Sequence, residues 1–444
     1  MCTHTLPNFD MSNHKWQRLQ EFRQEVYQNL GRARDATFEL MDAVMLSRKV
    51  DSLADLSLCP CFRRKWHSSY EALEDTRPNA NKLMRLYLGQ IPTESVVVMA
   101  GDHTPWPRPE AKSLKERTYQ HRGGDPWSRR PVTVGQGYST LAWVPESEGS
   151  WALPLRHERI TSWETPLTKA TWQLGQVCKN LPVRPLTLWD SEYGCASFVL
   201  KTADIRADKL MRVRSNRCVW GAPPAYGGRG RPRVHGEKFK LNDPTTWPTP
   251  AQETEVDHPK LGRVRVQMWH QLHFRPSPKH PMTLFQVERL EHPLRQPLWL
   301  AWVGLPTARP SIDVWRYYLR RFCVDHWYRF AKGRLHWTMP KLKTPQQAER
   351  WSTLMPAITW QLWLARDGIG DRPLPWQKPV GRLTPGRTAQ AIGSVFARLG
   401  TPARPPKPRG KSPGWPKGRG RHSFPTYPLV KKGLGRFRKP KGFP

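Results

Sequence analysis

Acidic residues are scarce in this chain of 444 residues. It carries 36 Asp and Glu against 72 Lys and Arg, which gives a formal net charge of +36 at pH 7. Solubility needs far less charge than this, so the excess indicates a polyanionic partner. Nucleic acid is the first candidate, and DNA or RNA binding is therefore expected.

Long apolar runs are also missing from the sequence. No run of about 18 consecutive apolar residues, the length that a membrane-spanning helix needs, is present. The first thirty residues stay polar and lack the apolar segment of a signal peptide. We therefore expect an intracellular protein that makes no membrane contact.

Cysteine is infrequent, and its spacing is uninformative for metal binding. The seven cysteines are scattered, and Cys59-Pro60-Cys61 is too closely spaced for a usual zinc pair. Free thiols are predicted. Tryptophan, in contrast, is abundant, with 22 residues. Most of these rings are expected in the core, although rings interleaved with cations also suit stacking on unpaired bases.

The hydrophobic period changes along the chain. Residues 11–90 repeat apolar positions at a spacing of three to four, which is typical of helices. After them, the short apolar runs Ser95–Gly101 and Pro185–Trp189 are typical of buried strands, and each ends at a carboxylate, Asp102 and Asp190. Between the two strands, Thr165 followed by Pro166 predicts the start of a helix. This alternation indicates an α/β sheet.

Composition divides the remainder. Residues 217–297 open with a Gly-, Pro- and Arg-rich stretch and continue with antiparallel strand patterns, so they are read as a β-rich insertion. Residues 401–444 contain thirteen Lys and Arg and no Asp or Glu, so a disordered basic tail that holds phosphates is expected. The predicted units are a helical, possible DNA-binding domain (1–92), a core in two parts (93–216 and 298–370) around the insertion (217–297), a helix with linker (371–400) and the tail (401–444).

One predicted helix carries a chemically distinctive face. In Ser311–Trp337 the residues Tyr318, Arg321, Asp325 and Lys332 are offset by 0, 3, 7 and 14 positions. On a helix these offsets place the four side chains within roughly 60° of one another. A carboxylate, two cations and a phenol on one face suit a metal-bound phosphodiester. The alternative is a solvent-exposed helix on which Arg321 and Lys332 form ordinary ion pairs.

The three acids have matching contexts. In open α/β sheets, ligands lie at the carboxyl ends of strands, where Asp102 and Asp190 are expected. Asp325 lies on the helix that follows in chain order. Two metal ions about 3.5–4 Å apart, held by carboxylates, are a known means of cutting phosphodiesters. Mg²⁺ prefers such oxygen ligands.

These residues resemble a known family. Asp102 with Thr104, Asp190 within Leu188–Gly194, and the Tyr-Arg-acid-Lys face are similar to the DDE-type transposases of bacterial insertion sequences. In that class the third acid lies in a Tyr-x2-Arg-x3-Glu-x6-Lys signature, and the spacing here is the same. The resemblance covers residues 95–340. One departure is that Asp325 stands where the family has Glu, a side chain that is one methylene longer.

The resemblance implies a ribonuclease H-like catalytic core with a β-rich insertion. It implies two Mg²⁺ ions, with Mn²⁺ as an alternative, held by Asp102, Asp190 and Asp325. The expected activity is cleavage at transposon ends and joining of the 3′-OH to target DNA. The implied partners are the terminal inverted repeats, the target DNA and a second copy of the chain, in the bacterial cytoplasm at the nucleoid.

Further roles follow from the same resemblance. Arg321 and Lys332 would bind phosphates near the cut, and Tyr318 would hydrogen-bond a phosphate oxygen. An aromatic ring of the insertion would stack on a base flipped from the duplex end. The candidates for that ring are Trp220, Trp247 and Trp269.

Several alternatives stay open at this point. Asp102 could instead cap a turn, and His103 is read as a turn residue, since Mg²⁺ sites avoid imidazole. Other acids compete for the two remaining metal positions: Glu192 and Asp204 with Asp190, and Asp313, Glu288 and Glu291 with Asp325. The functional alternatives are a degenerate, inactive transposase that only binds DNA, and a metal-dependent nuclease without strand transfer.

Overall fold

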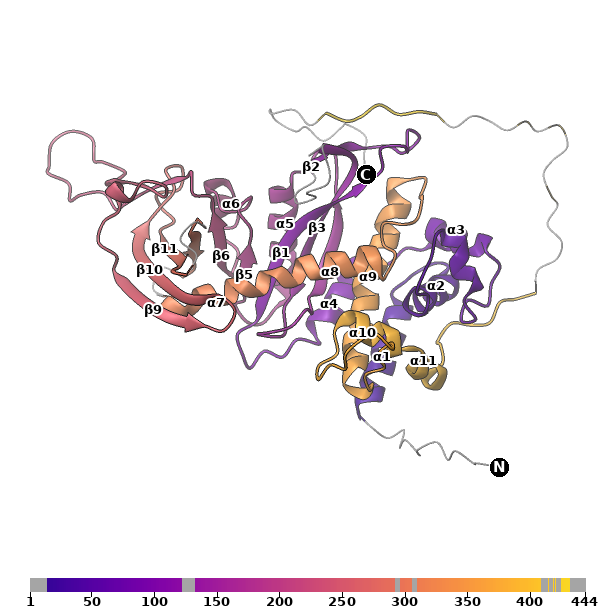
Figure 1. Cartoon of the computed structure of the whole chain (residues 1–444). Coiled ribbons are helices and arrows are strands. Elements are labelled where there is room, and N and C mark those ends of the chain that lie inside the picture. The colour runs from indigo at the N-terminus through magenta and orange to yellow at the C-terminus, as the bar shows by residue number, and fades with distance from the viewer. Residues whose placement is uncertain are drawn as a thin grey trace.

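The computed structural model describes residues 14–121, 132–291, 296–305, 310–408 and 425–431, together with residues 414, 418 and 420. Within them, helices and strands form one mixed α/β body built around a large sheet (Figure 1). No helix in these ranges is both long and apolar enough to cross a membrane.

Over the residues that the structure describes, the sheet has ten strands. Nine follow the order β2-β3-β1-β5-β6-β12-β11-β10-β9, and β4 also pairs with β3. Strands β1, β5 and β6 are mutually parallel, while β3 and β4 run antiparallel to their neighbours. The bounds are β1 Val98–Pro107, β2 Thr118–His121, β3 Val132–Trp143, β4 Leu153–Ile160, β5 Leu186–Trp189, β6 Asp208–Val213, β9 Gln252–His258, β10 Gly262–Leu272, β11 Met282–Arg289 and β12 Leu298–Val303. This large mixed sheet is compatible with the ribonuclease H-like fold that was expected.

The strands of the predicted insertion continue this sheet. β12 pairs with β6 on one side and with β11 on the other, so β9–β11 are joined to the core by an unbroken hydrogen-bonded ladder. They curve away at one end of the molecule (Figure 1). Only β7 (Cys218–Trp220) and β8 (Lys238–Lys240) form a separate two-stranded sheet.

Helices cover both faces of the sheet. On β3, Ser139 bonds Gln173 of α5, whereas the next residue, Thr140, bonds Tyr328 of α8. Neighbouring residues of a strand point to opposite faces, so α5 and α8 lie on opposite sides. Helix α9 packs on β4, and α1, α3 and α10 pack on α9. The bounds are α1 His14–Gln28, α2 Arg34–Leu46, α3 His67–Asp75, α4 Ala80–Leu88, α5 Pro166–Asn180, α6 Ala196–Lys201, α7 Trp315–Tyr318, α8 Phe322–Gly333, α9 Pro345–Ala365, α10 Pro385–Ala391 and α11 Gly393–Leu399, with 3-10 turns at Leu53–Leu58, Pro244–Thr246, Ile312–Val314, Leu319–Arg321 and Arg366–Gly368.

Local expectations are confirmed at some points and wrong at others. Thr165 caps α5 in a capping box, with Pro166 as its first residue, as predicted. The strand predicted to end at Asp102 instead continues to Pro107, because its second half pairs with β3. The long helix predicted over Ser311–Trp337 is divided by the 3-10 turn Leu319–Arg321 into α7 and α8.

Tryptophan fills the core, as expected for most of these rings. Among the described tryptophans, nine are less than 2% exposed: Trp106, Trp151, Trp189, Trp299, Trp315, Trp327, Trp337, Trp351 and Trp360. Several of their ring N–H groups donate to acceptors on other elements, whereas those of Trp106 and Trp299 are buried without a hydrogen-bond partner. The Trp327 Nε1 donates to Thr359 Oγ1 at 3.0 Å, and the Trp360 Nε1 donates to the Pro154 carbonyl at 2.9 Å. These bonds tie α8 and β4 to α9.

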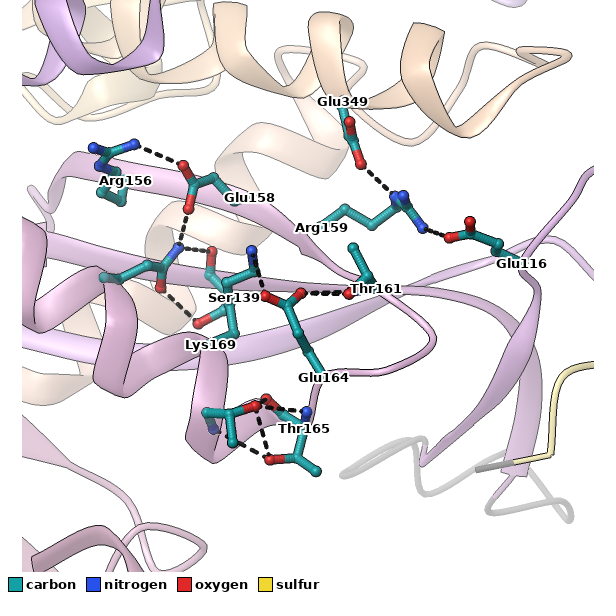
Figure 2. Close-up of polar contacts among 12 residues, drawn as sticks. Glu116, Ser139, Arg156, Glu158, Arg159, Thr161, Glu164, Thr165, Lys169 and Glu349 are labelled. Atoms are coloured by element: carbon teal, nitrogen blue, oxygen red, sulfur yellow. Dashed lines mark hydrogen bonds and ion pairs between the residues drawn. The ribbon is translucent and has the colours of Figure 1, made fainter. Parts of the chain in front are cut away.

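An ion network also fastens α9 to the sheet (Figure 2). Arg159 of β4 is buried and bridges two acids, Glu349 of α9 at 2.7 Å and Glu116 at 2.6 Å. On the same strand, Arg156 pairs with Glu158 at 2.8 Å. Because Glu116 lies just before β2 and Glu349 in the first turns of α9, one guanidinium joins three elements that are distant in the sequence.

Two described parts of the basic tail contact the folded body. At residues 401–408, the Ala403 carbonyl accepts a hydrogen bond from Arg63 at 2.7 Å. At 425–431, the Tyr427 N–H donates to the Lys112 carbonyl, and the Val430 N–H to the Arg117 carbonyl, each at 2.9 Å. Val430 also forms a parallel bridge with Thr118 of β2. These contacts hold two points of the tail, and the expectation of disorder over 401–444 stays a prediction.

Candidate active site

Parallel pairing aligns the first two predicted acids. Gly101 of β1 is opposite Trp189 of β5 in the parallel register. Asp102 and Asp190 are the next residues on each chain, so they lie side by side where this parallel pairing stops. Adjacent strands are about 4.8 Å apart, which brings the two carboxylates together at the carboxyl end of β5, beside the middle of β1.

The pleat decides which face Asp102 occupies. Asp102 is paired across the ladder with Thr140, and paired residues share a face. Thr140 Oγ1 accepts a hydrogen bond from the Tyr328 hydroxyl at 2.9 Å, and the same hydroxyl lies 2.9 Å from the Asp102 carbonyl oxygen. Asp102 therefore faces α8.

Arg321 connects the first acid with the third. Its Nη1 donates to Asp102 Oδ2 at 3.3 Å, and its Nη2 donates to Asp325 Oδ2 at 3.2 Å. The side chains of Arg321 and Asp102 are each 11% exposed, whereas that of Asp325 is 42% exposed. One largely buried guanidinium thus bridges the sheet acid and the more accessible helix acid.

The other two residues of the predicted helical face lie on either side of this bridge. Lys332 Nζ donates to Thr104 Oγ1 on β1 at 2.6 Å. Tyr318 is buried beside Arg321, and burial raises the pKa of its phenol to about 12. The hydroxyl therefore stays protonated and able to donate at neutral pH. Arg321 and Lys332 therefore contact β1 directly, and Asp325 is bonded to Arg321.

Burial and like charge make the Asp102 carboxylate costly to ionise. Burial is the main cause that raises the pKa of Asp102 to about 7, and the nearby charges of Asp190 and Asp325 add to it. Arg321 acts in the opposite direction. A buried acid whose pKa is raised by two neighbouring carboxylates marks a place where further positive charge is favourable.

The comparison with known families agrees with this site. The family model described as DDE superfamily endonuclease matches residues 25–273. The chain belongs to the DDE superfamily endonucleases. The matched region contains Asp102 and Asp190 and ends before Asp325. A search of curated proteins found no match.

The donor set of this candidate site fits a hard divalent cation. Its side-chain donors are carboxylate oxygens, which Mg²⁺ prefers. Across the described residues no three His, Cys, Asp or Glu side chains are already arranged to hold a metal ion. Instead, the guanidinium of Arg321 donates to both Asp102 and Asp325.

The competing residues have other contacts. Asp313 pairs with Arg316 at 2.9 Å, and Glu288 lies 3.8 Å from Arg265. The Glu291 carboxylate accepts from the Arg263 backbone N–H at 3.3 Å. On the other side, Glu192 lies 3.5 Å from His103 Nε2, close to the site, while Asp204 is exposed. Of the competing acids, Glu192 is the one that contacts His103, the residue next to Asp102.

The three candidate stacking rings have different surroundings. Trp247 and Trp269 pack against Trp299 at 5.2 and 5.8 Å between ring centroids, inside the aromatic cluster of the insertion. Their Nε1 groups donate to the carbonyls of Lys240 and Pro248. Trp220 is half-buried on β7 and lines a pocket of about 410 Å³.

Sequence reasoning missed several residues that shape the site. Tyr328 is bonded to both β1 and β3, yet its spacing in the sequence looks like an ordinary core position. Gly101 is required because a Cβ there would lie 2.0 Å from the Trp189 ring. The small residue directly before Asp102 was the available signal, since a glycine inside a strand often marks a close approach.

Proposed function

We propose that this DDE superfamily endonuclease is the DNA transposase of an insertion sequence. The observation that carries the proposal is the convergence of Asp102 and Asp190, side by side at the carboxyl end of β5, with Asp325, which Arg321 links to Asp102. The net charge of +36 supports DNA as the substrate.

The proposed chemistry assigns each residue a task. Asp102, Asp190 and Asp325 would hold two Mg²⁺ ions, or Mn²⁺, which activate the attacking oxygen and stabilise the leaving oxygen. In the first step, water attacks the phosphorus at the transposon end and the 3′-oxygen leaves as a hydroxyl. In the second step, that 3′-OH attacks a phosphodiester of target DNA and displaces its 3′-oxygen.

Positioning falls to the remaining side chains. Arg321 and Lys332 carry the positive charge beside Asp102 and Thr104, where a scissile phosphate would lie. Tyr318 would donate a hydrogen bond to a phosphate oxygen. A second protomer is part of the proposal, because two transposon ends must be joined in one assembly.

Trp220 is the best placed of the three rings for stacking on a flipped base. Its pocket is also lined by Cys195, Ser197, Arg217 and Arg275. Cys195 and Ser197 lie at the start of α6, and only a short loop separates them from Asp190. A half-buried ring in a pocket that two arginines also line suits an unpaired base beside its phosphates.

The decisive experiment uses a plasmid that carries the DNA flanking the reading frame on both sides. With Mg²⁺, the wild-type chain should produce cut ends and joined strands. Asp190→Asn should abolish both products while DNA binding and the circular dichroism spectrum stay unchanged. The matched control is Asp204→Asn, an exposed acid shortly after α6, which should retain activity.

The products separate the rival functions. Nicks without joined strands would indicate a nuclease without strand transfer, and intact DNA with salt-sensitive binding would indicate an inactive, DNA-binding relative. Cleavage by Asp190→Asn at the wild-type rate would remove Asp190 from the mechanism.

A further inference from the structure

A positively charged pocket lies at the end of the parallel strands opposite to the three acids. A pocket of about 440 Å³ opens where β5 and β6 begin and β12 ends. Its charged or imidazole-bearing lining residues are Arg184, Lys209, His270, Lys279 and His280. The described residues that line it include no Asp or Glu.

The strand register separates this pocket from the acid site. Lys209 is paired with Thr187, three residues before Asp190, so it lies on the order of 10 Å lower along the strands. Lys209 also points to the other face. Leu210 is aligned with Leu188, which lies on the same face of the sheet as Asp190. Its neighbour Lys209 therefore points to the opposite face, where α6 lies. A ligand in the pocket cannot contact the acids.

Lys209 is an unusual residue in this pocket. It is only 3% exposed, and its Nζ donates to the Thr202 carbonyl at 2.9 Å. Burial and the neighbouring charge of Arg184 lower the pKa of Lys209 to about 8. An ammonium group is rarely buried without an anionic partner, because desolvation of the charge is costly.

The nearest carboxylate does not neutralise the pocket. Asp208 Oδ1 accepts from Arg184 Nε at 2.6 Å, so its charge is engaged with that guanidinium. Lys209 and the exposed Lys279 remain as excess positive charges. The pocket therefore has a net positive charge and several N–H donors around a single opening.

The backbone beside the pocket is held in a strained form. Gln271 has φ 57°, in the left-handed region, and the register of β10 against β11 shifts between Trp269 and Leu272. His270 and Gln271 lie within this irregularity, and both line the pocket. His270 is fixed there, with its Nδ1 3.0 Å from Thr283 Oγ1. Such local strain is retained most often at binding sites.

We propose that this pocket binds a phosphate group, with Lys209 as its buried cation and Lys279 and Arg184 at its entrance. Phosphate matches the site because it accepts several charge-assisted hydrogen bonds at once. The phosphate can come from the backbone of bound DNA or from a small free anion. The chemistry of recognition is the same in both cases.

Inorganic phosphate is the first probe, titrated calorimetrically into the full chain at constant ionic strength. Lys279→Ala tests the exposed cation without disturbing the core, and Lys209→Met tests the buried one with a similar volume. Each should weaken phosphate binding about tenfold, the loss expected for one charge-assisted contact. The control is Lys260→Ala, which removes an exposed lysine between β9 and β10 that does not line the pocket. This variant should bind phosphate with unchanged affinity.

A second measurement identifies the source of the phosphate. The salt dependence of duplex DNA binding is compared among the same variants. A slope that falls by about one for each lost lysine assigns the pocket to the DNA backbone, and an unchanged slope assigns it to a free anion. If Lys279→Ala and folded Lys209→Met both bind phosphate as tightly as Lys260→Ala does, the proposal is wrong.

Discussion

Arg321 and Asp102 are 219 residues apart in the sequence, yet the guanidinium donates to the carboxylate at 3.3 Å. The contact joins a helix to the middle of β1 inside a largely buried setting. It keeps compensating charge next to an acid whose pKa burial raises to about 7. The pair therefore links the geometry of the sheet to the electrostatics of the proposed active site.

Removing this guanidinium should reduce cleavage strongly. Arg321→Met leaves Asp102 without its counter-charge and a bound phosphate without a donor, so the cleavage rate should fall by about a hundredfold. Single-turnover cleavage of end DNA measures the change. The control is Arg316→Met on the preceding turn, which removes an exposed pair with Asp313. Equal rates for the two variants would contradict the assigned role.

Cleavage should tolerate a longer carboxylate side chain at Asp325 but not a neutral side chain. The signature expected from the sequence has Glu at this position, and Asp325 is the more exposed of the two acids bonded to Arg321. Asp325→Glu should keep the cleavage rate within about tenfold of the wild type, because the carboxylate is retained. Asp325→Asn should lower it at least a hundredfold, as an order of magnitude. A reversed ranking would show that Asp325 is not a metal ligand.

Gly101 should be intolerant of any side chain. A Cβ at this position would meet the Trp189 ring at 2.0 Å, so Gly101→Ala should lower the free energy of unfolding by about 1–3 kcal/mol. Urea unfolding measures this loss. Gly370→Ala is the matched control, since its Cβ meets nothing within 4 Å. Adding Trp189→Leu to Gly101→Ala should recover part of the loss, and no recovery would mean that the collision is not the cause.

The Arg159 bridge should contribute measurably to stability. Arg159→Met leaves Glu116 and Glu349 without their shared partner, and the free energy of unfolding should fall by about 2 kcal/mol. Arg263→Met, which breaks an exposed pair with Glu255, should change it by less than about 0.5 kcal/mol. Thermal or urea unfolding compares them, and similar losses would argue against a special role for the buried bridge.

Acid should destabilise the fold through His157. Burial lowers the pKa of this imidazole from 6.5 to about 3, with Lys332 as a further cause. The folded state thus holds it neutral, while the unfolded chain takes up a proton below pH 6.5. Its contribution to stability is complete above that pH and is lost as the pH falls from 6.5 toward 3, by about 1.4 kcal/mol per pH unit.

The measurement is urea unfolding at pH 7.5 and at pH 5. His157→Gln should show a smaller loss of stability between the two pH values than the wild type. His67→Gln, at an exposed histidine, should behave as the wild type does. A pH dependence that is unchanged in His157→Gln would exclude the buried imidazole as its origin.

The sequence by itself determined the local features of this protein. Short-range patterns set the cap at Thr165, the buried strands before Asp102 and Asp190, and the spacing of Tyr318, Arg321, Asp325 and Lys332. Periodicity and capping depend on residues that are close in the sequence, so these helices and strands can be predicted from a single sequence. The charge excess likewise follows from composition alone.

Only the tertiary structure decided how these parts meet. β1 extends past Asp102 because β3 pairs with it, and β9–β11 join the core sheet because β12 pairs with β6. Tyr328 and Gly101 gain their roles from partners far away in the sequence, as does the phosphate pocket around Lys209. Hydrogen bonding across strands and burial of charge depend on long-range contacts, and no local pattern encodes those.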